Sequence, residues 1–248
     1  TVEAFLAVAD VAGKSVYRAR AGRIIRHIVN WAKENEWRIP EHYTKNGYRI
    51  WNAIRITGGS VKPYGATPGH GIEWARLITQ WTLSSDLSER EKMMFVESAE
   101  NLYNTAVKDA WNADGEPGIV YTTDWKGKPV YMTECTGHLR KAINTSSVLY
   151  RVTGKRKYSD DYAQFMKYLD EKVVESCQWI MVHQLNQKNE VIGTVWPGKS
   201  DIYHALQSML IPYYAPYLSI VPAVKRGLKK WMNDSFIDKK SNKRNTFY

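Results

Sequence analysis

Cysteine is scarce in this sequence, since only Cys135 and Cys177 occur among 248 residues. Neither stands in the close spacing of a metal site, and two cysteines cannot build a disulfide framework, so we expect a reducing, cytoplasmic setting. No apolar run reaches the length of a membrane span, and we expect no membrane partner. The motifs of phosphate cradles, dinucleotide sites and serine hydrolases are also absent. These absences exclude several common enzyme classes.

Acidic residues are outnumbered by basic ones, because 35 Lys and Arg stand against 25 Asp and Glu, a formal net charge of +10. Much of the excess lies near the C-terminus, which ends in a basic tail at about residues 233–248. A basic terminus is usually only solvated. No zinc-finger, RNA-recognition or helix-turn-helix signature accompanies the charge. We therefore expect no nucleic-acid partner.

Apolar and aromatic residues are plentiful. Hydrophobic residues make up 44% of the chain, with ten Trp and sixteen Tyr, which predicts an ordered globular protein rather than a disordered one. We expect one domain over residues 1–248. Trp and Tyr also suit sites for sugars or flat rings, although aromatic side chains serve more often in cores.

A helix–turn–helix unit repeats about every 67 residues. The units cover residues 2–35, 69–111 and 139–176, with a shorter copy over 200–232, and apolar residues recur in each at helical spacing. Extended stretches with Gly or Asn at their turns follow the first three units, over 37–51, 118–132 and 178–196, and predict small β-hairpins.

Helix pairs of this kind stack as an open solenoid or close into a ring. The copies differ in length and in loop content, which argues against a regular solenoid. A closed ring of six pairs has twelve helices, and this sequence accounts for about eight. We therefore predict an all-α fold, part of an (α/α)6 barrel with small β-hairpins in its loops, whose first four helices would precede Thr1.

Three histidines occupy equivalent positions in the repeats. His70, His138 and His204 lie 68 and 66 residues apart, each at the start of the first helix of its pair. Equivalent helix ends in a ring point to the same mouth, so we expect the three side chains to face one cavity. A helix N-terminus disfavours an imidazolium, which keeps the ring available as a base. Any one of them could instead be a helix-terminal polar residue bonded to backbone.

Glu73 follows His70 by one helical turn on the same face. It could orient the imidazole or stabilise its charged form. The alternative is a surface glutamate in a first helical turn, which helix electrostatics also favours.

Two segments, "YGATPGHGIEWARL" and "GTVWPGKSDIYHALQSMLIP", closely resemble signature segments of the N-acylglucosamine 2-epimerase superfamily. These two segments are most similar to those of its aldose–ketose isomerase branch, which includes mannose isomerase and sulfoquinovose isomerase. The resemblance covers essentially the whole chain, which is similar to the C-terminal three-fifths of a family member. It implies an (α/α)6 barrel, in agreement with the repeats.

The resemblance also implies roles for single residues. His70 and His204 would be the acid–base pair that moves protons on an open-chain sugar through a cis-enediol. Glu73 matches the carboxylate that supports the first histidine, and His183 matches a position that contacts sugar hydroxyls. Lys62 lies near a family arginine that binds the substrate. No metal or other cofactor is implied.

Two positions depart from the family pattern. Gly137 stands where the family usually has tryptophan, and Lys141 stands near a family glutamate, in a segment that normally walls the sugar pocket. Two outcomes are open. His138, to which the family gives no catalytic role, compensates as a contact to the substrate, or the activity is altered or lost.

The function that these features favour is that of a sugar isomerase converting an aldose to a ketose, of the mannose/fructose type, with a monosaccharide as its partner. The alternatives are a sugar 2-epimerase or a non-catalytic carbohydrate-binding homologue on the same scaffold. A glycosidase is less favoured, because it needs two carboxylates where this chain has histidines. We expect these 248 residues alone to be inactive, and either unstable or associated with a second copy or with the missing N-terminal part.

Overall fold

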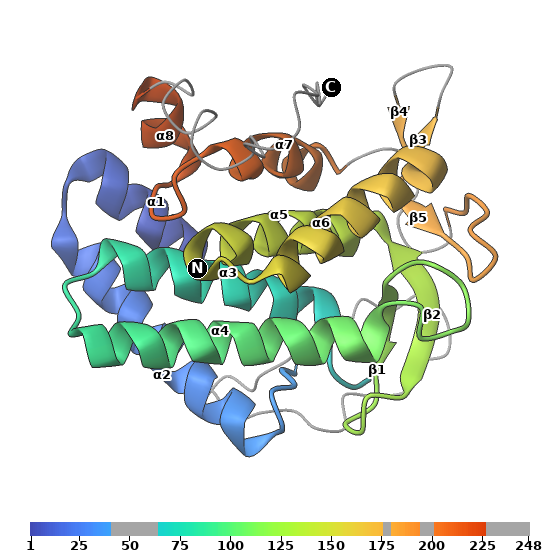
Figure 1. Cartoon of the computed structure of the whole chain (residues 1–248), viewed down its shortest axis with the longest axis horizontal. Helices are drawn as coiled ribbons and strands as arrows, with labels where there is room; N and C mark the ends of the chain where they lie inside the picture. The colour runs from blue at the N-terminus through green and yellow to red at the C-terminus, as the bar shows by residue number, and fades with distance from the viewer. Residues whose placement is uncertain (41–63, 176–179, 194–200, 227–248) are drawn as a thin grey trace.

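The computed structural model describes residues 1–40, 64–175, 180–193 and 201–226 (Figure 1). Within these ranges the chain forms four successive helix pairs, so the predicted number of about eight helices is confirmed for the described part. The helices are α1 (Val2–Ala12), α2 (Ser15–Glu34), α3 (Pro68–Ser84), α4 (Glu89–Ala110), α5 (Thr136–Thr153), α6 (Arg156–Tyr168), α7 (Ile202–Leu210) and α8 (Ile220–Arg226). A π-helical turn (Leu169–Val173) follows α6, and a 3-10 turn (Ile211–Tyr213) follows α7.

The turns inside the pairs follow from local chemistry. Gly13 ends α1 with φ 65° and Gly154 ends α5 with φ 68°, left-handed conformations that glycine adopts without steric cost. The turn between α3 and α4 is longer, and α4 begins with a capping box in which Ser88 and Glu91 bond each other's backbone amides. The first and third helix pairs are thus closed by the same kind of turn, whereas α3 ends at Ser85 in extended backbone.

Strands occur in two of the predicted stretches, 118–132 and the described part of 178–196. Strands β1 (Val120–Thr123), β2 (Pro129–Cys135) and β5 (Gln184–Leu185) form an antiparallel sheet in the order β1-β2-β5. A second antiparallel pair joins β3 (Val174–Glu175) to β4 (Ile180–Met181). Positive φ angles fall on Gly127 and Asn189, in the turns that follow β1 and β5. Most of the stretch predicted over 37–51 and the basic tail at 233–248 lie outside the described residues.

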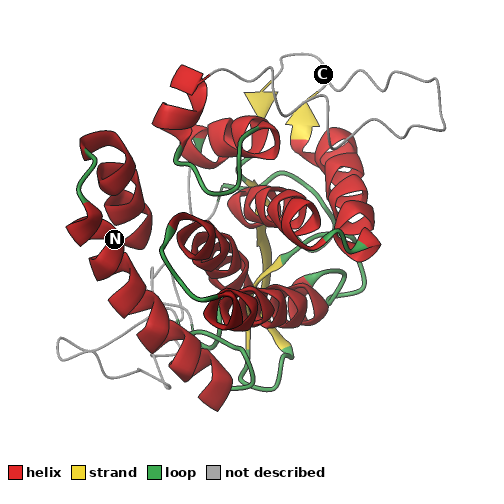
Figure 2. Ribbon diagram, turned by 60° about the vertical axis from the view of Figure 1, so that its left-hand side comes forward, coloured by secondary structure: helices red, strands yellow, loops and turns green. Residues whose placement is uncertain are grey.

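The strands gather at one end of the helices, beside the N-terminal ends of α3 and α5 (Figure 1). The helices α1, α3, α5 and α7 contact one another in that order, and α2, α4 and α6 each pack behind the first helix of their own pair. Helices near the centre of Figure 2 appear nearly end on and side by side. Every residue of α5 from Thr136 to Leu149 is buried, which makes α5 the centre of the fold.

The last pair is attached differently. The hydrophobic core of the described residues takes side chains from α1 to α6 and from the loop strands, and none from α7 or α8. On α7 the apolar side chains of Ile202, Leu206 and Met209 are 80%, 51% and 59% exposed. Polar contacts hold α7 instead, such as the hydrogen bond from Gln207 to Glu3 of α1. One apolar face of the described structure is therefore open to solvent.

Candidate active site

The three repeated histidines lie at the same end of the fold. His70, His138 and His204 are each the third residue of their helix, on α3, α5 and α7. The ring centroids of His70 and His138 are 6.4 Å apart, and both His70 and His204 lower the pKa of His138 by their charge. The structure therefore places the three helix starts at the same end of the fold, and the prediction that the three side chains face one cavity stays a prediction.

His204 is held by a carboxylate. Asp201 is the N-cap of α7, and its Oδ1 accepts a hydrogen bond from the His204 backbone amide and lies 2.5 Å from His204 Nδ1. Its Oδ2 accepts a bond of 2.8 Å from the Arg140 guanidinium, which is almost fully buried on α5. Because a carboxylate can only accept, Nδ1 carries the proton, and Nε2 of His204 is the nitrogen available for chemistry.

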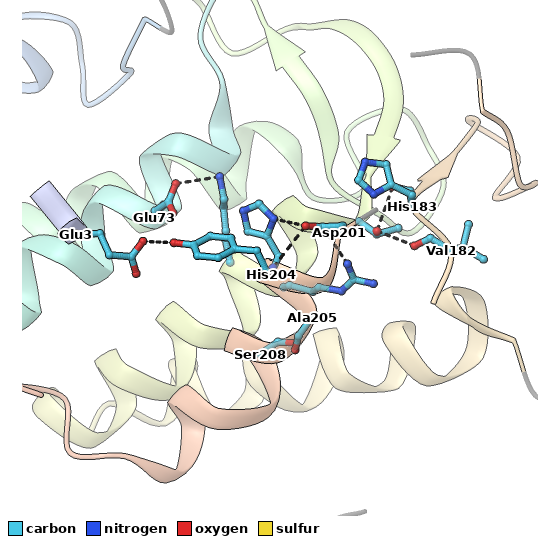
Figure 3. A network of polar contacts seen from close by, with 12 residues as sticks. Glu3, Glu73, Val182, His183, Asp201, His204, Ala205 and Ser208 are labelled. Atoms are coloured by element: carbon cyan, nitrogen blue, oxygen red, sulfur yellow. Dashed lines mark hydrogen bonds and ion pairs between the residues drawn. The ribbon is translucent and has the colours of Figure 1, made fainter. Parts of the chain in front are cut away.

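The charge of Asp201 is stabilised by its neighbours. Burial by itself raises the pKa of a carboxyl, but the hydrogen bond and charge of His204, together with Arg140 and His183, hold the pKa of Asp201 below its usual value. His183 lies beside this group, as Figure 3 shows, and burial lowers its own pKa against the attraction of Asp201. The aspartate is therefore ionised, orients the His204 ring through its hydrogen bond, and attracts His183 by its charge.

His138 lies in the packed interior beneath the mouth. Its side chain stacks on Tyr121 with ring centroids 5.4 Å apart, and a Cβ on Gly69 would lie only 2.1 Å from its Cδ2. His138 is 4% exposed, and its Nδ1 has no hydrogen-bond partner among the described residues. Burial first, and then the charge of Lys141, hold its pKa well below the usual range. His138 is a neutral imidazole, and its contact with a substrate stays a prediction.

Glu73 forms an ion pair with Lys141. Its Oε2 lies 2.9 Å from the Lys141 ammonium, across the contact of α3 with α5. Burial alone would raise the pKa of Glu73, but the charges of Lys141, Arg76 and His70 hold it below its usual value. Glu73 is therefore ionised and close enough to His70 to interact with it, which is compatible with the supporting role that the resemblance implies.

A layer of polar residues lies one turn below the histidines, and the sequence reasoning missed it. Glu3 on α1 accepts hydrogen bonds from Arg76 on α3 (2.6 Å), from Gln207 on α7 (2.9 Å) and from the Tyr203 hydroxyl. Together with the pairs Glu73–Lys141 and Arg140–Asp201, these contacts link α1, α3, α5 and α7 in a closed sequence. Figure 3 shows three of its members, Glu3, Glu73 and Asp201.

The same repeat spacing could have revealed this layer. Glu3, Glu73, Lys141 and Gln207 lie 70, 68 and 66 residues apart, and the last three follow the three histidines by three positions each. Asp201 also had a sequence signal, because aspartate directly before an amphipathic stretch is typical of an N-cap.

A cavity of about 460 Å³ opens between α1, α3, α5 and α7. Glu3, Arg76, Tyr203 and Gln207 line it, whereas neither His70 nor His204 does. Gly137 lies directly against Asp201 and His204, because a Cβ there would stand 3.1 Å from Asp201 Oδ2 and 3.2 Å from His204 Nδ1. A glycine at this position therefore leaves room for the Asp201–His204 contact.

Lys62 falls outside the described residues. Among the residues that are described, no group of three or more His, Cys, Asp or Glu side chains could hold a metal ion. Each of the described helices is too short or too polar to span a lipid bilayer.

Comparisons with known proteins relate this geometry to sequences and folds. A sequence model of the family described as N-acylglucosamine 2-epimerase matches residues 1–208. The chain is 34% identical to the D-mannose isomerase of Pseudomonas cannabina pv. alisalensis over 221 residues, which are 86% of this chain and 52% of that protein. It is 32% identical to the D-mannose isomerase of Thermobifida fusca over 218 residues, 85% of this chain and again 52% of the relative.

The chain thus spans about half the length of the curated relatives that it matches. A crystal structure of D-mannose isomerase superposes with a TM-score of 0.75 at 19% identity, covering 85% of this chain and 54% of that one. This likeness concerns the fold, and it confirms the prediction of a partial (α/α)6 barrel with small hairpins in its loops.

Proposed function

Because the chain belongs to the N-acylglucosamine 2-epimerase family, we propose that it carries the acid–base pair of a sugar isomerase that interconverts an aldose and a ketose. The observation that carries this proposal is the convergence of His70 and His204 at one end of the barrel, each with a carboxylate close by. Two relatives named D-mannose isomerase support mannose as the aldose, for which the ketose of this proposal is fructose.

The chemistry requires two proton carriers near neutral pH, and histidine is suited to it. One imidazole removes the C2 proton of the open-chain aldose while O1 takes up a proton, so that the C2–H electron pair forms the C1=C2 bond of a cis-enediol. The hydroxyl proton on O2 then leaves, a proton is delivered to C1, and the ketose results. In this proposal, Asp201 keeps His204 in the tautomer whose Nε2 faces the sugar.

Glu73 and His183 have supporting roles in this scheme. Glu73 stabilises His70 when it holds the abstracted proton, because an ionised carboxylate favours a neighbouring imidazolium. His183 and His138 would contact sugar hydroxyls. The reaction as proposed needs no metal or other cofactor. We also propose a cytoplasmic location, supported by the two cysteines in no disulfide spacing.

The second candidate is 2-epimerisation, which the family name itself supports. The same base would open the reaction, and the proton would return to C2 on the opposite face instead of moving to C1. A carbohydrate-binding homologue without catalysis is the third, supported by the departures at Gly137 and Lys141.

A product assay tests the proposal. The protein expressed from its complete reading frame is incubated with mannose in D2O, and its products are separated. We expect fructose, with deuterium incorporated at C1. Glucose carrying deuterium at C2 would favour the epimerase instead. If neither product nor exchange at C2 appeared with mannose or with several other aldoses, both enzyme proposals would be wrong and the binding homologue would be favoured.

We also propose that these 248 residues associate when they are produced alone, because Ile202, Leu206 and Met209 form an exposed apolar face on α7. Light scattering after size exclusion is expected to give a mass above that of a 28.6 kDa monomer. Replacing Leu206 and Met209 together by glutamate should shift the chain toward the monomer. Glutamate at Met93 and Met94, exposed on α4, is the control and should not. A wild-type chain that elutes as a stable monomer would contradict this expectation.

A further inference from the structure

Lys141 is a buried cation at the mouth of the barrel. Its side chain is 8% exposed, and that of its partner Glu73 is 20% exposed. The ammonium and the carboxylate are 2.9 Å apart, one helical turn below His138 and His70 respectively. A buried charge of either sign is costly without its partner, so each of the two side chains holds the other in place.

Among the described residues, the two arginines nearest this pair along α3 and α5 already have carboxylate partners. Arg76, on the same helix as Glu73, donates to Glu3 of α1, and Arg140, beside Lys141 on α5, donates to Asp201. Within the part of the chain that the structure describes, the titratable groups around the pair are Glu3, His70, Arg76, Tyr121, Cys135, His138, Arg140, Asp201, Tyr203 and His204. Lys141 is thus the cation bonded directly to the carboxylate that acts on His70.

We propose that Lys141 is a positioning residue, which fixes the carboxylate of Glu73 beneath His70 and offsets its charge, and so sets the pH at which His70 becomes a base. The inference rests on the proposed function. An uncompensated carboxylate beside an imidazole favours the protonated ring, whereas a cation on the far side of that carboxylate reduces this effect. With Lys141 in place, His70 loses its proton at a lower pH and is available as a base over a wider range.

The sign of the charge at position 141 matters for this effect. The family resemblance leads to a glutamate near Lys141, and a second carboxylate there would act on Glu73 and His70 with the opposite sign. Lys141 also lowers the pKa of His138, so the same ammonium keeps the imidazole between the two proposed catalysts neutral. Both effects reduce the number of protons held at the mouth near neutral pH.

The test uses the pH profile of kcat/KM for the protein expressed from its complete reading frame. We expect Lys141→Met to move the acid limb of the profile to higher pH by about one unit. This is the size of shift that an uncompensated carboxylate, here Glu73, produces in the pKa of a nearby imidazole. We expect kcat at pH 6.5 to fall severalfold and KM to change little, because Lys141 makes no contact with the sugar in this scheme. Lys141→Arg keeps the positive charge and should leave the acid limb at the pH of the unchanged protein.

Two further variants make the test specific. In a Glu73→Gln background, Lys141→Met should move the acid limb no further, because the lysine acts through the glutamate. Lys155→Met is the matched control, since Lys155 pairs with Glu100 at 2.6 Å at the start of α6, away from the histidines, and it should leave the profile unchanged. If Lys141→Met does not fold, Lys141→Gln removes the charge and keeps a hydrogen-bond donor, with the same shift expected.

The outcomes distinguish failure of the inference about Lys141 from failure of the proposed function. A wild-type enzyme that is active, with an acid limb that does not move in Lys141→Met or Lys141→Gln, overturns the inference and leaves the proposed function standing. A merely structural lysine would lower the denaturation midpoint without moving the limb. A wild-type protein with no turnover and no C2 exchange on any aldose overturns the proposed function, and the inference with it.

Discussion

The His70→Gln variant is expected to turn over its aldose about 10²–10⁴ times more slowly than the unchanged protein, the range for loss of a general acid–base group. Glutamine keeps the length and the hydrogen-bonding capacity of the side chain but cannot carry the proton. His70 is the third residue of α3 and interacts with the ionised Glu73, so its loss should remove the base and leave the barrel intact. Isomerisation and C2 exchange in D2O are both measured.

The control is His27→Gln. His27 lies exposed on α2, and its ring centroid is 6.1 Å from that of Trp31. The helix α2 packs behind α1 and carries none of the three repeated histidines. It should leave turnover unchanged. Thermal unfolding of both variants should stay close to that of the unchanged protein. A His70→Gln protein that keeps more than about a tenth of the wild-type rate would remove His70 from the acid–base pair.

The second large effect concerns stability and pH, at a buried acid outside the proposed active site. Glu134 on β2 is 3% exposed, and its Oε2 lies 2.5 Å from the Tyr168 hydroxyl. That hydroxyl also faces Oδ1 of Asn189, and its single proton can serve only one of the two oxygens. A protonated Glu134 supplies the second hydrogen bond. Burial, with the charge of Asp114, raises the pKa of Glu134 to about 8.

The sign of the effect follows from proton linkage. The folded state holds the Glu134 proton up to about pH 8, whereas the unfolded chain releases it near the ordinary value of 4.5. The free energy of unfolding should therefore fall as pH rises between these values, by about 1.4 kcal/mol per pH unit from this one group. Between pH 5 and pH 8 the loss should approach about 4 kcal/mol.

Urea denaturation at pH 5 and pH 8 measures this loss. The neutral isostere Glu134→Gln should flatten the pH dependence by that amount relative to the unchanged protein. Glu116→Gln, an exposed residue in the nearby loop, should have no such effect. Parallel pH dependences in Glu134→Gln and in the wild type would show that Glu134 is ionised in the folded state.

Much of the architecture could be predicted from local pattern. Apolar spacing predicted the helices, because helical period is a property of a few neighbouring residues, and Gly13 and Gly154 end two of them by an equally local preference for left-handed backbone. The repeat spacing placed His70, His138 and His204 at equivalent helix starts for the same reason. Family resemblance then attached a chemistry to two of these three.

The sequence by itself therefore determined the helix pairs, their order, and the end of the barrel at which the histidines meet. Only the tertiary structure decided which charges face one another there. The contacts of Glu73 with Lys141 and of Asp201 with Arg140 join residues from different repeats, about 60 to 70 positions apart. Such pairings depend on the packing of α3, α5 and α7, and the same packing buries His138. The spacing of residues within one helix does not specify how closely that helix packs against another.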